Sequence, residues 1–428
     1  MSSRPKITRR GFLKTSLAAM AAPAIIPATS LGKDGATAPS DRITMGLIGI
    51  GKQGEGHVRA LSRNAAVQVL AICDVYKKFA DLGIKYVTDA YASNKPDGKY
   101  RGVQGYVDYR ELIARDDIDA VLIAVPDHQH AIVAILAAQS GKDIYCEKPL
   151  SLTISEARAM VNAVRSYGRV FQTGSQQRSS REFLIACQLV RNGYIGRIKE
   201  VFVGVGVSSQ PCDLPGQPIP EGLDWDRSHG PAPYRPFNEV LRPNHNRSFP
   251  NWRAYRDYSG GAMTDFGAHH FDIAQWGLGM DATGPVEVIP PDGKDVQYLT
   301  YRYANGIPMY RGGPPAVTFV GTEGEVYVDR GKLTTKPDHL AQMPFKVSDI
   351  HLYKSPGHHQ DWINCIRSRN LPICDVEIGC RTASVCHIGN IACWLNRPLK
   401  WDPVKEVFPG DDEANRWLSR AYREPYVL

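Results

Sequence analysis

The sequence predicts an α/β protein in two parts, a doubly wound parallel sheet followed by an α+β domain with an open antiparallel sheet. Three observations predict this. Apolar strands alternate with amphipathic helices over residues 42–174. After that point the strands alternate in polarity, and Asn305-Gly306 gives a hairpin signal that Pro308 weakens. With 428 residues, the chain also exceeds the usual size of a single core.

The first predicted strand, residues 43–48, runs directly into Gly49-Ile50-Gly51-Lys52-Gln53-Gly54. A helical pattern follows, and then a second apolar strand at 67–73 that ends in Asp74. Strand, glycine loop, helix, second strand and terminal acid are the context that a dinucleotide-binding (Rossmann) loop requires. The glycines permit a tight turn, close approach of a pyrophosphate, and packing of helix on strand, while the helix N-terminus attracts the anion. A structural glycine turn in another α/β protein is the alternative.

Asp74 bears on which dinucleotide binds. A carboxylate at this position accepts hydrogen bonds from both ribose hydroxyls of NAD and repels the 2′-phosphate of NADP. Lys77 and Lys78 could offset part of that repulsion. We therefore expect NAD rather than NADP.

The N-terminal segment explains most of the basic charge. Residues 1–31 carry five of the seven net positive charges and no acid, so the rest of the chain has a balance of +2, which does not favour nucleic acid as a partner. Thr8-Arg9-Arg10-Gly11-Phe12-Leu13-Lys14 matches the twin-arginine pattern, and the apolar stretch 15–26 is too short and too broken by Pro23 to span a membrane. We predict a signal peptide and folded export to the periplasm by the twin-arginine machinery, a disordered basic tail being the alternative.

Free nicotinamide cofactor is expected to be scarce outside the inner membrane, so a cofactor carried there would be held tightly. The proline-rich segment 208–249 is too long for an idle loop and is expected to line a cleft. Together, these observations predict five regions. They are a signal at 1–31, a linker at 32–41, a cofactor domain at 42–174, a domain for substrate binding and homo-oligomer contacts at 175–400, and a tail at 401–428.

Two polar loops leave the ends of predicted strands on the nucleotide side. Residues 126–130 follow the apolar strand 120–125, and Glu147-Lys148-Pro149 follow the strand 143–146. Ligands of parallel α/β sheets bind at this carboxyl edge. The predicted cofactor-binding residues are Gly49, Gly51, Lys52, Gln53, Gly54, Asp74, Pro126, His130, Glu147 and Lys148.

A third stretch, 260–272, reads Gly-Gly-Ala-Met-Thr-Asp-Phe-Gly-Ala-His-His-Phe-Asp and looks like the start of a helix. On a helix, Asp265 and His269 project from one face, because they are four residues apart. Together with the glycine loop and Glu147-Lys148-Pro149, this stretch resembles the family of glucose-fructose oxidoreductase, inositol 2-dehydrogenase and rhizopine-catabolism dehydrogenases. The resemblance covers residues 42–400.

The resemblance implies a nucleotide domain, an open sheet for substrate and oligomer contacts, and a cis peptide bond before Pro149. It places the family's lysine, aspartate and histidine at Lys148, Asp265 and His269, which would serve hydride transfer from a sugar or polyol carbinol. His269 suits the base, since imidazole titrates near neutral pH. Lys148 would stabilise negative charge on the reacting oxygen.

Each of these residues has a plainer interpretation. Lys148 could be a surface lysine, His269 a structural histidine with His270 as the base, and Asp265 a helix N-cap. No third ligand accompanies Asp265 and His269, so no metal is predicted. Polar groups beside a tryptophan suit a sugar. The predicted substrate-binding residues are Gln176, Arg178, Trp252, Arg253 and His270.

Three functions remain open from the sequence. The first is an exported NAD-dependent sugar, polyol or glycoside oxidoreductase. The second is a glycosidase that uses bound NAD in a transient oxidation, although the branch known for that chemistry lacks the Asp-Phe-Gly-Ala-His-His pattern. The third is a non-catalytic sugar-binding protein, which would not need Lys148, Asp265 and His269 together.

Overall fold

The computed structural model describes residues 38–93, 99–242 and 251–428. The predicted signal at 1–31 and most of the predicted linker lie outside these residues. Within them, no helix is both long and apolar enough to cross a membrane.

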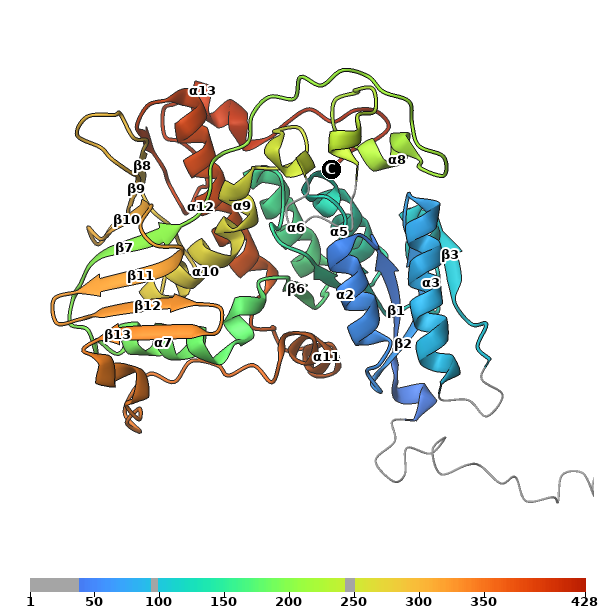
Figure 1. The fold of residues 1–428 in the computed structure, drawn as a ribbon, viewed down its shortest axis with the longest axis horizontal. Coiled ribbons are helices and arrows are strands. Elements are labelled where there is room, and N and C mark those ends of the chain that lie inside the picture. Colours follow the sequence, from blue (N-terminus) through green and yellow to red (C-terminus); the bar gives the residue numbers. More distant parts are fainter. Residues whose placement is uncertain (1–37, 94–98, 243–250) are drawn as a thin grey trace, which may run out of the picture. The chain divides into compact units, whose positions relative to one another are not determined.

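The first sheet has six parallel strands in the order β3-β2-β1-β4-β5-β6 (Figure 1). The chain order reverses between β1 and β4, which leaves a crevice at the carboxyl ends of these two strands. Two apolar clusters bury its central strands, as the continuous apolar sequences predict. The strands are β1 (Ile43–Ile48), β2 (Val67–Cys73), β3 (Gln104–Tyr106), β4 (Ala120–Ile123), β5 (Asp143–Cys146) and β6 (Phe171–Thr173).

The helices of this half follow the predicted alternation. At the start of the last one, the sequence Thr-Ile-Ser-Glu at 153–156 has the pattern of a capping box, and the structure contains it: each of the Thr153 and Glu156 side chains accepts the other residue's backbone N–H. The helices are α2 (Lys52–Leu61), α3 (Lys77–Ala92), α4 (Tyr109–Ile113), α5 (His130–Gln139) and α6 (Ile154–Ser166).

The second sheet has eight strands in the order β13-β12-β11-β7-β10-β9-β8-β14. It is mostly antiparallel, as predicted, with one parallel pairing between β7 and β10. The predicted hairpin is present, and Pro308 opens its second strand opposite Arg302. The strands are β7 (Ile198–Gly204), β8 (Glu287–Ile289), β9 (Leu299–Arg302), β10 (Pro308–Arg311), β11 (Ala316–Gly321), β12 (Glu325–Asp329), β13 (Lys332–Lys336) and β14 (Leu399–Lys400).

Helices α7, α10 and α12 cover one face of this sheet and build its core with residues such as Phe271, Tyr301 and Phe319 (Figure 1). The other face carries contacting rings of Phe202, Tyr298 and Tyr310. The helices of this half are α7 (Arg181–Arg191), α8 (Trp225–His229), α9 (Ala262–Asp265), α10 (Gly267–Leu278), α11 (His358–Ser368), α12 (Val376–Leu395) and α13 (Asp412–Asn415).

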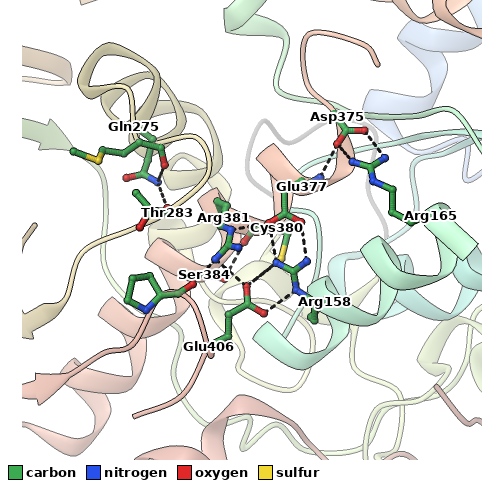
Figure 2. Close-up of polar contacts among 12 residues, drawn as sticks. Arg158, Arg165, Gln275, Thr283, Asp375, Glu377, Cys380, Arg381, Ser384 and Glu406 are labelled. Atoms are coloured by element: carbon green, nitrogen blue, oxygen red, sulfur yellow. Dashed lines mark hydrogen bonds and ion pairs between the residues drawn. The ribbon is translucent and has the colours of Figure 1, made fainter. Parts of the chain in front are cut away.

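Charged side chains join the two halves. Arg158 on α6 donates to Glu377 of α12 at 2.7 Å and to Glu406 at 2.8 Å, and Arg165 pairs with Asp375 (Figure 2). These bonds hold α12 against the cofactor half.

The proline-rich segment also returns to the first sheet. The backbone N–H of Lys77 donates to the carbonyl of Gly222 at 2.9 Å, and that of Asp224 donates to Val75 at 2.9 Å. Trp225 is buried in the apolar cluster that also contains residues of β1 and β2. Residues 222–224 of the segment therefore cover the end of β2, beside Asp74.

Candidate functional site

A cavity of about 320 Å³ lies at the carboxyl edge of the first sheet, between the glycine loop and the start of α10. It takes residues from both halves of the chain. Its lining includes most predicted site residues, namely Gly49, Gly51, Lys52, Gln53, Asp74, Pro126, Glu147, Lys148, Gln176, Trp252, Arg253, Asp265 and His269.

The glycine loop has the form that a pyrophosphate needs. Gly49 has φ +87°, which favours glycine, and a Cβ at Gly54 would lie 2.0 Å from the carbonyl oxygen of Gly49. A Cβ at Gly51 would meet no atom within 4 Å, so the space above it is open for a ligand. The loop delivers the first N–H groups of α2 to the cavity. Gly54 does not line the cavity but permits its tight turn.

Asp74 closes the far end of this loop. Its two carboxylate oxygens accept backbone N–H groups from Ile50 at 2.7 Å and Tyr76 at 2.8 Å. Each oxygen keeps a further lone pair for a ribose hydroxyl. Burial raises the pKa of Asp74 to about 6, against the lowering effect of the two backbone bonds. The open loop and this acid fit NAD.

Lys148 and Asp265 meet across the cavity, although 117 residues separate them in the sequence. Lys148 Nζ lies 2.6 Å from Asp265 Oδ1, and Arg253 Nε lies 3.1 Å from the same oxygen. Burial opposes ionisation of Asp265, but Lys148 and then Arg253 lower its pKa below the usual value. The peptide bond between Lys148 and Pro149 is cis, as the family resemblance implies.

His269 is 2% exposed and lines the same cavity. Burial, and then the charges of Lys148 and Arg330, lower its pKa well below 6.5. The imidazole is therefore neutral at neutral pH, and one of its ring nitrogens carries a lone pair. Neither ring nitrogen has a hydrogen-bond partner among the described residues, and Nδ1 is fully buried. The Oε1 atom of Gln176 is also buried without a hydrogen-bond partner among the described residues. His269 and Gln176 therefore each present a polar atom in the cavity wall that could bond a ligand.

Contrary to the prediction, Asp265 and His269 do not lie on one continuous helix. Asp265 ends α9 and Gly267 begins α10, with Phe266 as the link in αR geometry. Because Phe266 has αR geometry, the chain continues in nearly the same direction, and the side chains of Asp265 and His269 both line the cavity. Asp265 is not an N-cap, since Gly261 occupies that position.

Glu147 is held from behind the cavity. Its Oε1 lies 2.8 Å from His57 Nε2, and His57 Nδ1 lies 2.8 Å from His359 Nε2 on α11. Burial would raise the pKa of Glu147, but the hydrogen bond from His57 and the charge of Lys148 lower it to about 2. A buried carboxylate thus fixes the strand end that carries Lys148.

Three predicted ligand-contacting residues lie elsewhere. Arg178 is buried in bonds to Asp272 at 2.8 Å and Asp281 at 2.7 Å, so it serves the fold rather than the substrate. Both ring nitrogens of His130 face backbone carbonyls, at 2.8 and 2.9 Å, so it ties two loops together and does not reach the cavity. His270 lies 3.1 Å from the carbonyl of Gly204 and lines a neighbouring hollow.

Several residues that line the cavity were not predicted from the sequence. Phe266 stands within the quoted motif but was not assigned a role. Gln129 lies in a predicted edge loop, and Ser228 lies in the proline-rich segment expected to line a cleft. Arg330 follows β12 and has no local signal, because only the packing of the second sheet brings it to the site.

Fold and site together are those of a two-domain protein whose first half is an NAD-binding Rossmann domain. Residues 43–175 match the family profile described as oxidoreductase family, NAD-binding Rossmann fold, and residues 202–428 match that of the oxidoreductase family C-terminal alpha/beta domain. The chain belongs to the Gfo/Idh/MocA family of oxidoreductases, as the resemblance implied.

Solved structures share the fold. The WlbA dehydrogenase from Bordetella pertussis, in complex with NADH and UDP-GlcNAcA, is 18% identical with a TM-score of 0.57. Aldose-aldose oxidoreductase from Caulobacter crescentus is 19% identical with a TM-score of 0.56. Each similarity covers 84% of this chain and 99% of the other.

Curated relatives add a different chemistry. Glycosyl hydrolase family 109 proteins of Shewanella pealeana and Shewanella baltica are 32% identical, over 209 and 208 residues. The matches cover 45% of this chain and 44% of each relative, so the chain spans less than half of the curated relatives' length.

Proposed function

We propose that the protein transfers a hydride between a carbinol carbon of a sugar, polyol or glycoside and a tightly bound NAD. The observation that carries this proposal is the convergence of Lys148, Asp265 and His269 on the cavity that the glycine loop opens. A cavity lined by ionic side chains, a tryptophan and unpartnered polar atoms suits a polyhydroxylated substrate.

The residues divide the work of oxidation. Bound NAD supplies the hydride acceptor. His269, neutral and unpartnered, takes the hydroxyl proton, so that the C–O⁻ character developing at the carbinol is relieved. Lys148 stabilises negative charge on that oxygen, and Asp265 holds the ammonium in place at 2.6 Å.

A sugar panel tests this function. Purified protein is incubated with aldoses, polyols and glycosides, and reduced cofactor is followed by absorbance while native mass spectrometry counts bound nucleotide and subunits. Reduction of bound NAD by at least one sugar, lost in His269→Gln, supports the proposal. Full activity in both His269→Gln and Lys148→Ala would overturn the assignment of the site.

A second candidate is a glycosidase that oxidises its substrate transiently, eliminates the aglycone, adds water and reduces the product again. The similarity to glycosyl hydrolase family 109 proteins favours it. Aryl glycosides separate the two functions: repeated aglycone release without accumulation of reduced cofactor identifies the glycosidase. Sugar binding with neither reaction would identify a non-catalytic sugar-binding protein.

Export belongs to the same proposal. The twin-arginine pattern at Thr8–Lys14 would carry the chain, folded and already loaded with NAD, to the periplasm as a homo-oligomer. The return of the proline-rich segment over the end of β2 supports retention of the nucleotide. Cell fractionation of an Arg9→Lys, Arg10→Lys double variant tests the route, and periplasmic accumulation of that variant would refute it.

A further inference from the structure

A second hollow adjoins the cofactor cavity. It measures about 420 Å³, within the range of small-ligand pockets, and its walls include Gly204, Gly206, Phe266, His270, Asp329 and Arg330. Phe266 and Arg330 line both spaces. The consecutive residues His269 and His270 face one space each, so the hollow lies one residue from the proposed base.

Phe266 is exposed where its neighbours are not. Phe266 is 42% exposed as a residue, whereas Asp265 is 5% and Ala268 4% exposed. Phe266, the link between α9 and α10, therefore presents an exposed aromatic ring to both spaces. Such a ring packs on the apolar C–H face of a sugar.

Two polar groups stand beside this ring at the end of β12. Asp329 Oδ1 accepts the backbone N–H of Arg330 at 2.7 Å, while its Oδ2 has no partner within the described ranges. The guanidinium of Arg330 likewise makes no hydrogen bond or ion pair with another described residue, although its charge acts on His269 and His270. The hollow thus offers a ligand one hydrogen-bond acceptor, the Asp329 carboxylate, and one planar donor, the Arg330 guanidinium.

This pairing selects the ligand class. A lone arginine would suit a carboxylate or phosphate, but the adjacent Asp329 carboxylate repels an anion. Neutral hydroxyls satisfy both groups, since they donate to the carboxylate and accept from the guanidinium.

We infer that the hollow is a subsite for a second, neutral sugar ring, so that the substrate is a disaccharide or larger glycoside whose reacting ring lies beside His269. This inference rests on the proposed function and narrows its substrate class. Phe266 stacks on one or both rings at their junction, and Asp329 and Arg330 bind hydroxyls of the second ring.

The test compares matched sugars. Neutral disaccharides such as cellobiose, maltose and lactose are each paired with the methyl glycoside of the ring that could react, and kcat/KM is measured for both. The wild-type protein should favour the disaccharide at least about tenfold. That ratio should fall toward one in Phe266→Ala and Arg330→Gln, and in the isosteric Asp329→Asn. Tyr167→Ala, which removes a 47% exposed aromatic that lines neither cavity, is the matched control and should keep the ratio.

Titration calorimetry with the same pairs separates this inference from the proposed function. If no sugar reacts, the function fails, but tighter binding of a disaccharide that is lost in Phe266→Ala and Arg330→Gln still supports the subsite. Equal binding of the paired sugars, or no binding, overturns it. So does a change of subunit number in Phe266→Ala with an unchanged ratio, which would make the hollow a contact between chains.

Discussion

Replacing Lys148 with methionine removes an ammonium group and keeps a side chain of similar length. The ammonium lies 2.6 Å from Asp265 and its side chain is 14% exposed, so it is fixed before substrate binds. Removing one preorganised donor from an active site costs about 10²- to 10³-fold in kcat, or about 2.7–4 kcal/mol. We expect a loss of that size in Lys148→Met, with bound nucleotide retained.

The same change should move the pH profile. Burial first, and Lys148 second, lower the pKa of His269. A base works only when neutral, so activity falls as pH drops through that pKa. Without the Lys148 charge the proton is held more readily, the pKa of His269 rises, and the acid limb of kcat/KM moves to higher pH. Asp265 remains paired with Arg253 at 3.1 Å and stays ionised.

Single-turnover reduction of bound NAD between about pH 4.5 and 9 measures both effects. Native mass spectrometry confirms equal nucleotide content, and Lys77→Met, which removes a 72% exposed lysine, is the matched control. Turnover within about threefold of wild type would refute the role of Lys148 at the reacting oxygen. An acid limb that stays in place would refute the electrostatic link to His269.

Three further changes test other parts of the site. Arg178→Met leaves Asp272 as a buried unpaired charge, so denaturant titration should show a loss of about 3–5 kcal/mol in unfolding free energy, and a stability like wild type would contradict the ion pair. The pKa of Glu147 falls from 4.5 to about 2 on folding, so its ionised form stabilises the fold above about pH 4.5 and loses that effect as pH drops through 2. Glu147→Gln should therefore lower the unfolding free energy at pH 7 by about 3 kcal/mol and flatten its acid dependence, unless His57 finds another partner. Asp74→Asn should lower the preference for NAD over NADP about tenfold in equilibrium binding, and an unchanged ratio would mean that Asp74 does not contact the ribose.

The sequence predicts the cofactor half well because its signals are local. The glycine loop, its flanking strands and the capping box at Thr153 each lie within a short window. Strand β3 (Gln104–Tyr106) is an exception, since it has no apolar run and joins the sheet edge through backbone pairing with β2.

The second half depends more on contacts between distant residues. No local pattern states that β7 and β10 run parallel, because strand neighbours are set by packing. Arg178 was predicted to bind substrate because it lies two residues from Gln176 in the sequence. In the structure its side chain turns into the core, so nearness in sequence did not predict its role. Asp265 and Lys148 were paired through family resemblance, whereas Arg330 had no signal at all.

The bond between His57 and His359 gives helix α2, which follows the glycine loop, a partner 302 residues later in the chain. Thr173, at the end of the last strand of the first sheet, likewise donates its backbone N–H to Cys374. Synthesis runs from the N-terminus, so the glycine loop leaves the ribosome long before the residues that brace it. The nucleotide site is thus finished only after residues 359–374 have been synthesised, so on the proposed export route the nucleotide would be held tightly only from that point on.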